Sequence, residues 1–233
     1  SMTKKKHSTK AETGLENIEE ALTASERFIE NNQKKILLAL LVLVIVVGSA
    51  IAYNYLYKHP RNEKAHTALF KGERYFQQQE DSIAIFGNGN DYLGFERIIK
   101  DYHGSKAADL AHAYAGISYS RLGDNEKALK HLNKFKGGDL LITPAITGAV
   151  GDVYMNMGNT DKAIASFKAA AKKANDDMLS PIYYNKVGLA YFNTGNYDKA
   201  IETFKMIKDK YINSPQAHEA EKYIEASKLQ QNK

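Results

Sequence analysis

The apolar residues of this chain are concentrated in one segment near the N-terminus. Residues 36–53 carry no charged side chain, and only Gly48 and Ser49 interrupt the aliphatic run. Tyrosines at positions 53, 55 and 57 continue the segment as far as Lys58. A helix over residues 36–57 would be about 33 Å long, which matches the ~30 Å hydrocarbon core of a bilayer. The pattern predicts one transmembrane helix over residues 36–57, with tyrosines at one interface.

Two other interpretations of this segment are open. A buried helix of a soluble core would rarely need so long a stretch without charge. A cleaved signal peptide is the stronger alternative, because residues 50–52 (Ala-Ile-Ala) resemble a small-x-small cleavage site. However, the apolar run exceeds the roughly 7–15 residues of a signal-peptide core, and 35 residues precede it. We therefore expect an uncleaved signal anchor.

The segment before the predicted span shows a helical pattern over residues 12–30. Leu15, Ile18, Leu22 and Ile29 recur at intervals that place them on one helix face. A single amphipathic helix has no core of its own and must pack on a membrane or a partner. Six glutamates precede the span, so we expect a protein partner rather than anionic lipid. Residues 1–35 are predicted to form a tail that contains this helix, and the lysines at positions 4, 5, 6 and 10 mildly favour a cytoplasmic location for it.

After the predicted span, one pattern occurs three times. The sequence Gly-x-x-x-Lys-Ala begins at Gly123, Gly158 and Gly195, at spacings of 35 and 37 residues. Another glycine lies seven residues before each of these, and a tyrosine follows that glycine by three positions. A large apolar residue follows each alanine by four positions. The matched positions are Gly116, Gly151 and Gly188; Tyr119, Tyr154 and Tyr191; Ala128, Ala163 and Ala200; and Leu132, Phe167 and Phe204.

This spacing predicts two helices in every repeat. Gly123 and its equivalents turn the chain after the first helix, and the earlier glycine lets the second helix approach closely. A lone helical hairpin cannot bury its apolar face, so neighbouring hairpins must stack. A degenerate copy precedes the three. Gly72 and Tyr75 match its first helix, and Gly94, Phe95 and Ile98 match its second helix. The loop between them is enlarged by about ten residues, which include 82–89. A final helix after Pro215 should cap the stack through Ala217, Ala220, Ile224 and Ser227.

The last copy resembles the tetratricopeptide repeat through the ladder Gly188, Tyr191, Gly195, Tyr197, Ala200 and Phe204. The tryptophan of that family's first helix is replaced by His112, Thr147 and Tyr184. The predicted fold class is all-α: an N-terminal transmembrane helix is followed by an α-solenoid over residues 58–233. We expect about three clear tetratricopeptide repeats, one degenerate repeat and a capping helix.

On that family's register, the first helices line a concave groove that binds polypeptides. The groove mixes apolar residues with amides and charges, which suits an extended or helical polypeptide with apolar anchors. Ala113 and Gly148 replace the lysines of the family's carboxylate clamp, so a C-terminal carboxylate is not the expected ligand. An equally open alternative is that several of these residues belong to the core between repeats. The predicted protein-binding residues are Ile117, Arg121, Asp152, Met155, Asn156, Asn185, Leu189, Phe192 and Asn193.

Composition and motifs argue against catalysis. The chain has no cysteine, which excludes thiol nucleophiles and thiolate zinc sites. Its seven histidines are scattered without a metal-chelating pair, and residues 87–91 lack the lysine of a phosphate-binding loop. The net charge of +5 is diluted over the solenoid and does not indicate nucleic acid. We predict no enzymatic activity, no cofactor, no metal and no nucleic-acid partner.

The order of tail, span and repeats resembles the bacterial YfgM-like proteins, ancillary subunits of the Sec translocon. The closest local similarity is the sequence RFIENNQK at residues 27–34, directly before the span. The resemblance implies an inner-membrane protein with a cytoplasmic N-terminus and a periplasmic repeat domain. It further implies binding to the SecYEG channel and to a periplasmic chaperone during protein export.

Two alternatives to this role remain. One is a repeat scaffold of another envelope complex, and the other is a cytoplasm-facing adaptor with inverted topology. Within 15 residues of the span, three basic residues precede it and four follow it. The charges next to the span therefore leave its orientation open.

Overall fold

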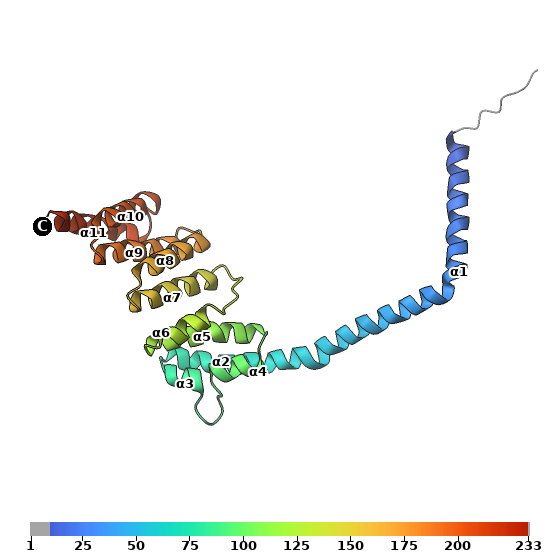
Figure 1. Cartoon of the computed structure of the whole chain (residues 1–233), viewed down its shortest axis with the longest axis horizontal. Helices are drawn as coiled ribbons and strands as arrows, with labels where there is room; N and C mark the ends of the chain where they lie inside the picture. Colours follow the sequence, from blue (N-terminus) through green and yellow to red (C-terminus); the bar gives the residue numbers. More distant parts are fainter. Residues whose placement is uncertain (1–9, 233) are drawn as a thin grey trace, which may run out of the picture. The chain divides into compact units, whose positions relative to one another are not determined.

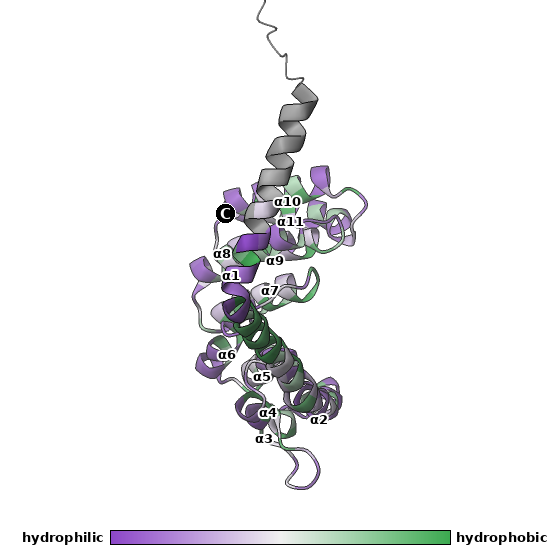
Figure 2. Cartoon of the chain, turned by 90° about the vertical axis from the view of Figure 1, so that its right-hand side faces the viewer, coloured by the Kyte–Doolittle hydropathy of each residue, from purple (hydrophilic) through white to green (hydrophobic). Residues whose placement is uncertain are grey.

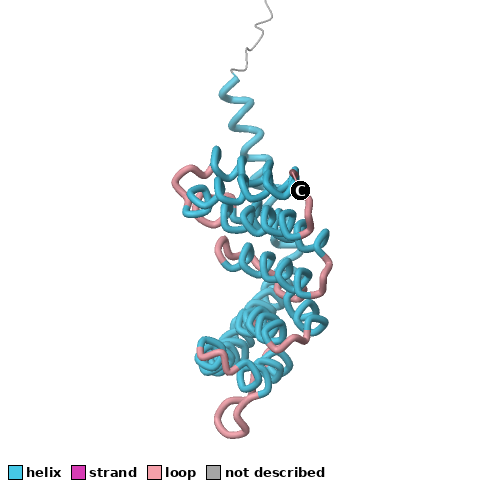
Figure 3. The backbone as a smooth tube through the Cα atoms, turned by 90° about the vertical axis from the view of Figure 1, so that its left-hand side faces the viewer, coloured by secondary structure: helices cyan, strands magenta, loops and turns pink. Residues whose placement is uncertain are grey.

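The computed structural model describes residues 10–232, and every regular element among them is helical (Figure 3). The chain divides into two compact units, Ser1–Pro60 and Arg61–Lys233, which are described separately below. The prediction of an all-α chain is confirmed for the described residues.

The first unit is built on one long helix. Helix α1 runs from Lys10 to Tyr53, and the five-residue π-helical segment η1, Asn54–Lys58, follows it directly. The segments predicted as an amphipathic helix over 12–30 and a span over 36–57 lie in one continuous helical stretch, which α1 and η1 form together. The large apolar side chains between residues 37 and 57 are exposed, and the ribbon of α1 carries a hydrophobic stretch in Figure 2. This helix is long and apolar enough to cross a membrane.

The second unit is a stack of helical hairpins (Figure 1). From α5 onward, each first helix packs against its second helix, and each second helix except α6 packs strongly on the helix that follows it. The helices are α2 (His59–Gln77), α3 (Asp81–Phe86), α4 (Phe95–Asp101), α5 (Lys106–Arg121), α6 (Asn125–Leu132), α7 (Ile142–Asn156), α8 (Thr160–Ala174), α9 (Ser180–Asn193), α10 (Tyr197–Lys210) and α11 (Pro215–Gln231). The three clear repeats are α5 with α6, α7 with α8, and α9 with α10.

A glycine on each first helix allows the second helix to come close. A Cβ atom added to Gly188 would lie 2.7 Å from the ring of Phe204. The same atom on Gly116 would lie 2.6 Å from Leu132 Cγ. The predicted close approach at these glycines is confirmed, and the residue that fills the space is the large apolar residue of the same repeat.

The turn inside each repeat also follows the predicted pattern. Gly123, Gly158 and Gly195 adopt φ angles of +84°, +73° and +76°, a region that favours glycine. The next residue caps the second helix: Asp124, for example, accepts a hydrogen bond from the backbone N–H of Lys127. This cap satisfies one of the free N–H groups at the start of the helix.

The degenerate repeat is formed by α2 and α4, where Gly72 lies against the ring of Phe95. The expanded loop between them differs from the expectation, because Asp81–Phe86 folds as the short helix α3. Tyr92 is almost fully buried and donates a 2.6 Å hydrogen bond to the backbone oxygen of Ala84, which fixes the rest of the loop to α3. The predicted loop over 82–89 is therefore partly helical.

Helix α11 closes the stack as predicted. Its buried residues are Ala217, Ala220, Ile224 and Ser227. Ser214 caps the helix by accepting a hydrogen bond from the backbone N–H of Ala217.

Candidate functional site

The predicted groove residues lie on the first helices α5, α7 and α9. Three of them, Arg121, Asn156 and Asn193, are exposed. The other six are half-buried, so they line the surface and also contact the interior: Ile117, Asp152, Met155, Asn185, Leu189 and Phe192.

The apolar members of the set take part in packing between helices. Ile117 packs on the core of the first repeats, and Met155 packs on the cluster formed by α8 and α9. The ring centroid of Phe192 lies 5.7 Å from that of Tyr197 and 6.2 Å from that of Tyr223 on α11. Each of these side chains therefore combines a structural contact with a partly exposed surface.

The charged members of the set already have partners within the chain. Asp152 on α7 forms an ion pair with Lys186 on α9, at 2.6 Å between Oδ1 and Nζ. Arg121 reaches the nearly buried carboxylate of Asp81 at 3.4 Å and lies 4.4 Å above the ring of Phe76. These contacts tie neighbouring repeats together and leave less of either charge for a ligand.

Asn185 is the member of the set whose side-chain oxygen is both buried and unpaired. Its Oδ1 atom is buried and accepts no hydrogen bond from the described residues. Asn185, Leu189 and Phe192 lie on the same face of α9, since they are separated by four and three residues. A buried acceptor left unpaired costs free energy, so such a group calls for an explanation.

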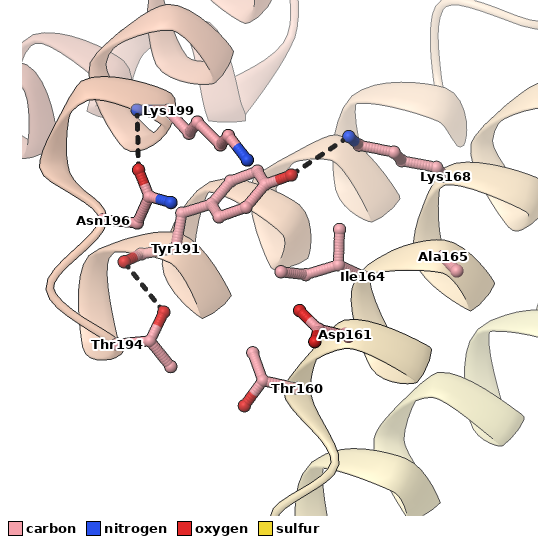
Figure 4. Close-up of a pocket in the computed structure, with 9 residues that line it drawn as sticks. All are labelled: Thr160, Asp161, Ile164, Ala165, Lys168, Tyr191, Thr194, Asn196 and Lys199. Carbon is pink, nitrogen blue, oxygen red and sulfur yellow. Dashed lines mark hydrogen bonds between the residues drawn. The ribbon is translucent and has the colours of Figure 1, made fainter.

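Two pockets occur away from this face, between the second helix α8 and the following pair α9 and α10. They have volumes of about 370 and 300 Å³ and share Lys168, Tyr191 and Lys199. Lys168 Nζ lies 3.1 Å from the Tyr191 hydroxyl, and Lys199 Nζ lies 5.4 Å from the ring centroid (Figure 4). None of the nine predicted groove residues lines either pocket.

The tyrosine and lysine at this pocket occur in every clear repeat. The motif lysine lies over the motif tyrosine in Lys127–Tyr119, Lys162–Tyr154 and Lys199–Tyr191, at 5.2 to 5.4 Å from nitrogen to ring centroid. This recurring cation–π contact links the two helices of a repeat and explains why both residue types recur in the sequence. The pockets are therefore by-products of repeat packing rather than a specialised site.

A polar cluster that was not predicted lies between α4, α5 and α6. His131 is buried; its Nε2 lies 3.1 Å from Glu96 Oε1, which also accepts a 2.8 Å hydrogen bond from Tyr119. Burial lowers the pKa of His131, so we interpret this contact as a hydrogen bond from a neutral imidazole. Burial, followed by the Glu96 hydrogen bond, raises the pKa of Tyr119.

His112 completes this cluster, with its Nδ1 3.1 Å from Nδ1 of His131. Sequence reasoning placed His112 in the position of a missing tryptophan but gave no sign of its partner 19 residues away. Among residues 10–232, no group of three or more histidine or carboxylate side chains is arranged to hold a metal ion.

Comparisons with known proteins support the helical repeat fold. Residues 150–215 match the tetratricopeptide repeat family. No curated protein matches the chain significantly. Two crystal structures of a Podosopora anserina protein, described as a kinesin light chain with nearly identical TPR-like repeats, share the fold. Their TM-scores are 0.58 and 0.57 at 10% and 11% identity, over 73% of this chain and 88% of theirs.

A third structure, the MamA protein, is 19% identical over 73% of this chain and 93% of its own, at a TM-score of 0.44. That score is too low to support an argument about fold. The family match therefore covers residues 150–215, and the two structures with higher scores show that the chain shares a TPR-like helical repeat fold.

Proposed function

We propose that this protein is a membrane-anchored, non-enzymatic scaffold that binds polypeptides on the first-helix face of its solenoid. The observation that carries the proposal is the face of α9, where the half-exposed Leu189 and Phe192 lie in line with the half-buried Asn185 and next to the exposed Asn193. A polypeptide in the groove can cover the apolar side chains and form hydrogen bonds with the exposed amide of Asn193.

The anchor is supported by the exposed apolar length of α1. In water, a contiguous apolar surface of this size would be unfavourable, whereas a bilayer covers it. The rings of Tyr53 and Tyr57 stack at 5.4 Å between centroids, and Lys58 and Arg61 follow them. Aromatic and basic residues at the end of an apolar helix are typical of a membrane interface.

The finer proposal follows the resemblance to YfgM-like proteins. The N-terminus would lie in the cytoplasm and the repeats in the periplasm, where the scaffold would assist chains that leave a SecYEG-type channel and pass them to a periplasmic chaperone. Two alternative functions are a scaffold of another envelope complex and a cytoplasm-facing adaptor with inverted topology. The same anchor and repeats would suit either function.

Affinity purification of the full chain in mild detergent tests the binding role. We expect translocon subunits to co-purify, and their absence would contradict the translocon role. Asn185→Ala should reduce capture of polypeptides without lowering stability, because it removes a buried polar atom that has no internal partner. The matched control is Asn133→Ala at an exposed position outside the groove.

Cysteine labelling of intact cells tests the topology. The chain has no native cysteine, so Ser8→Cys and His218→Cys each introduce a single label site, and His218 is exposed. An impermeant maleimide should label position 218 and spare position 8. The reverse result would show the inverted topology.

A further inference from the structure

One edge of the second unit carries exposed apolar side chains. They lie in the loops between α6 and α7, between α8 and α9, and between α10 and α11. Leu140 and Leu141 are 83% and 67% exposed in the loop between α6 and α7. Met178, between α8 and α9, is 78% exposed, and Ile212, between α10 and α11, is 68% exposed. Successive helices run in opposite directions, so these loops lie along the same edge of the unit (Figure 1).

The same edge is also basic. We call it the inter-repeat edge and define it as residues 100–106, 130–141, 172–179 and 208–214. These ranges hold nine lysines against five aspartates. The turns on the opposite edge, residues 122–127, 157–162 and 194–199, hold three lysines against four acidic residues. Positive charge and exposed apolar tips are therefore combined on one edge.

Most of the aspartates on the inter-repeat edge already have partners. Asp101 forms an ion pair with Arg97 at 2.7 Å. Asp139 accepts hydrogen bonds from the backbone N–H groups of Leu141 and Ile142, at 2.7 and 3.0 Å. Asp176 accepts hydrogen bonds from those of Met178 and Leu179, at 2.8 and 2.6 Å. Lysines in the last turn of a helix also complement the helix dipole, but Lys134 and Lys136 lie in a loop beyond the end of α6.

The chain enters the second unit at this edge. Arg61, the first residue of the unit, donates hydrogen bonds to the backbone oxygens of Asp101 and His103, at 3.0 and 3.3 Å. Only residues 58–60 separate Arg61 from Tyr57, where the predicted span ends. Four residue steps reach at most about 14 Å, so a membrane that holds the span lies near the end of this edge that residues 100–106 form.

We propose that the inter-repeat edge docks on a bilayer surface that contains anionic lipid, with Leu140, Leu141, Met178 and Ile212 inserted among the headgroups. This inference rests on the membrane anchor of the proposed function. Lysines attract anionic headgroups, and apolar side chains at loop tips can enter the interface without changes in the helices. Docking would hold the solenoid along the membrane and leave its first helices free to bind polypeptides.

Spin labels on the full chain in lipid nanodiscs test the docking. Leu140→Cys, Met178→Cys and Ile212→Cys place a nitroxide on the inter-repeat edge. Leu122→Cys and Met157→Cys are matched controls at exposed apolar positions on the opposite edge. In phosphatidylcholine nanodiscs with phosphatidylglycerol, the edge labels should be several-fold less accessible to an aqueous nickel complex than the controls. Equal accessibility would overturn the inference.

A label at Val44→Cys separates failure of the docking from failure of the anchor. If position 44 is buried in lipid while the edge labels remain in water, the docking is wrong and the anchor stands. If position 44 is also in water, both are wrong. Protection that appears only after a membrane extract is added would identify a protein occupant and overturn the lipid proposal. Lys134→Gln with Lys136→Gln should reduce the protection, whereas Lys127→Gln with Lys162→Gln on the opposite edge should not.

Discussion

Nδ1 of His112 lies 3.1 Å from Nδ1 of His131, in the cluster that Glu96 and Tyr119 complete. His131 can direct its Nε2–H to Glu96, which leaves its Nδ1 to accept from Nδ1–H of His112. This arrangement requires His131 to be neutral, because its Nδ1 must remain unprotonated to accept. Burial and the neighbouring His131 lower the pKa of His112 to about 4. The cluster therefore links the stability of the first clear repeat to pH.

Stability of the repeat unit should fall as the pH decreases from about 6.5 to about 4. In this window, the unfolded chain binds protons at His112 and His131 that the folded chain excludes. Because His112 is only half-buried, we expect a loss of about 1–2 kcal/mol. Urea unfolding of the full chain in detergent, followed across this pH range, measures the effect. His112→Phe should flatten the dependence, and exposed His218→Gln should not; an unchanged dependence in His112→Phe would contradict the assignment.

Gly188→Ala should destabilise the last repeat by about 1–3 kcal/mol, because the added methyl would overlap the Phe204 ring. Thermal unfolding measures the loss. In the Phe204→Leu background, Gly188→Ala should cost clearly less, since the smaller side chain can move aside. Strict additivity of the two changes would show that this contact does not set the helix spacing.

Arg121→Ala should destabilise the fold by about 1–2 kcal/mol, since it leaves the nearly buried Asp81 carboxylate without its ion-pair partner. The matched change is Lys186→Ala, which breaks a more exposed pair with Asp152. That change should cost less than about 1 kcal/mol. Chemical denaturation compares the two, and an equal cost would contradict the structural role assigned to Arg121.

Val44→Arg should weaken membrane insertion, because a charged residue near the middle of a spanning helix costs about 2.5–3.5 kcal/mol. Alkaline extraction of membranes measures the fraction that remains integrated. Val44→Leu is the control that keeps the site apolar. If Val44→Arg remains in the membrane fraction as firmly as Val44→Leu, α1 does not cross the membrane at this position.

The sequence predicted the contacts that recur with the repeat. Gly116, Gly151 and Gly188 meet Leu132, Phe167 and Phe204 because a fixed spacing places each pair at the crossing of two helices. Such contacts are local, and three copies make their register visible. The capping helix could be predicted for the same reason, since its small residues continue the stack.

The contacts that occur once could not be predicted in this way. Asp81 and Arg121 are 40 residues apart, and nothing in the repeat pattern pairs them. Helix α3 lies in an insertion that has no counterpart in the other copies. For the predicted groove residues, the family's register gave positions on the first helices but not the partners of Asp152 and Arg121, because side-chain pairing depends on the packing between repeats.

Photo-crosslinking in living cells is the most direct test of the binding role on a membrane anchor. A photoreactive amino acid would replace the exposed Asn193 on the first-helix face, with Lys205, exposed on α10, as the control position. We expect polypeptide adducts in the membrane fraction from position 193 and few from position 205. Changing Asn185 to alanine should reduce the adducts from position 193. Equal adducts from both positions, or adducts that do not respond to Asn185→Ala, would contradict the binding role.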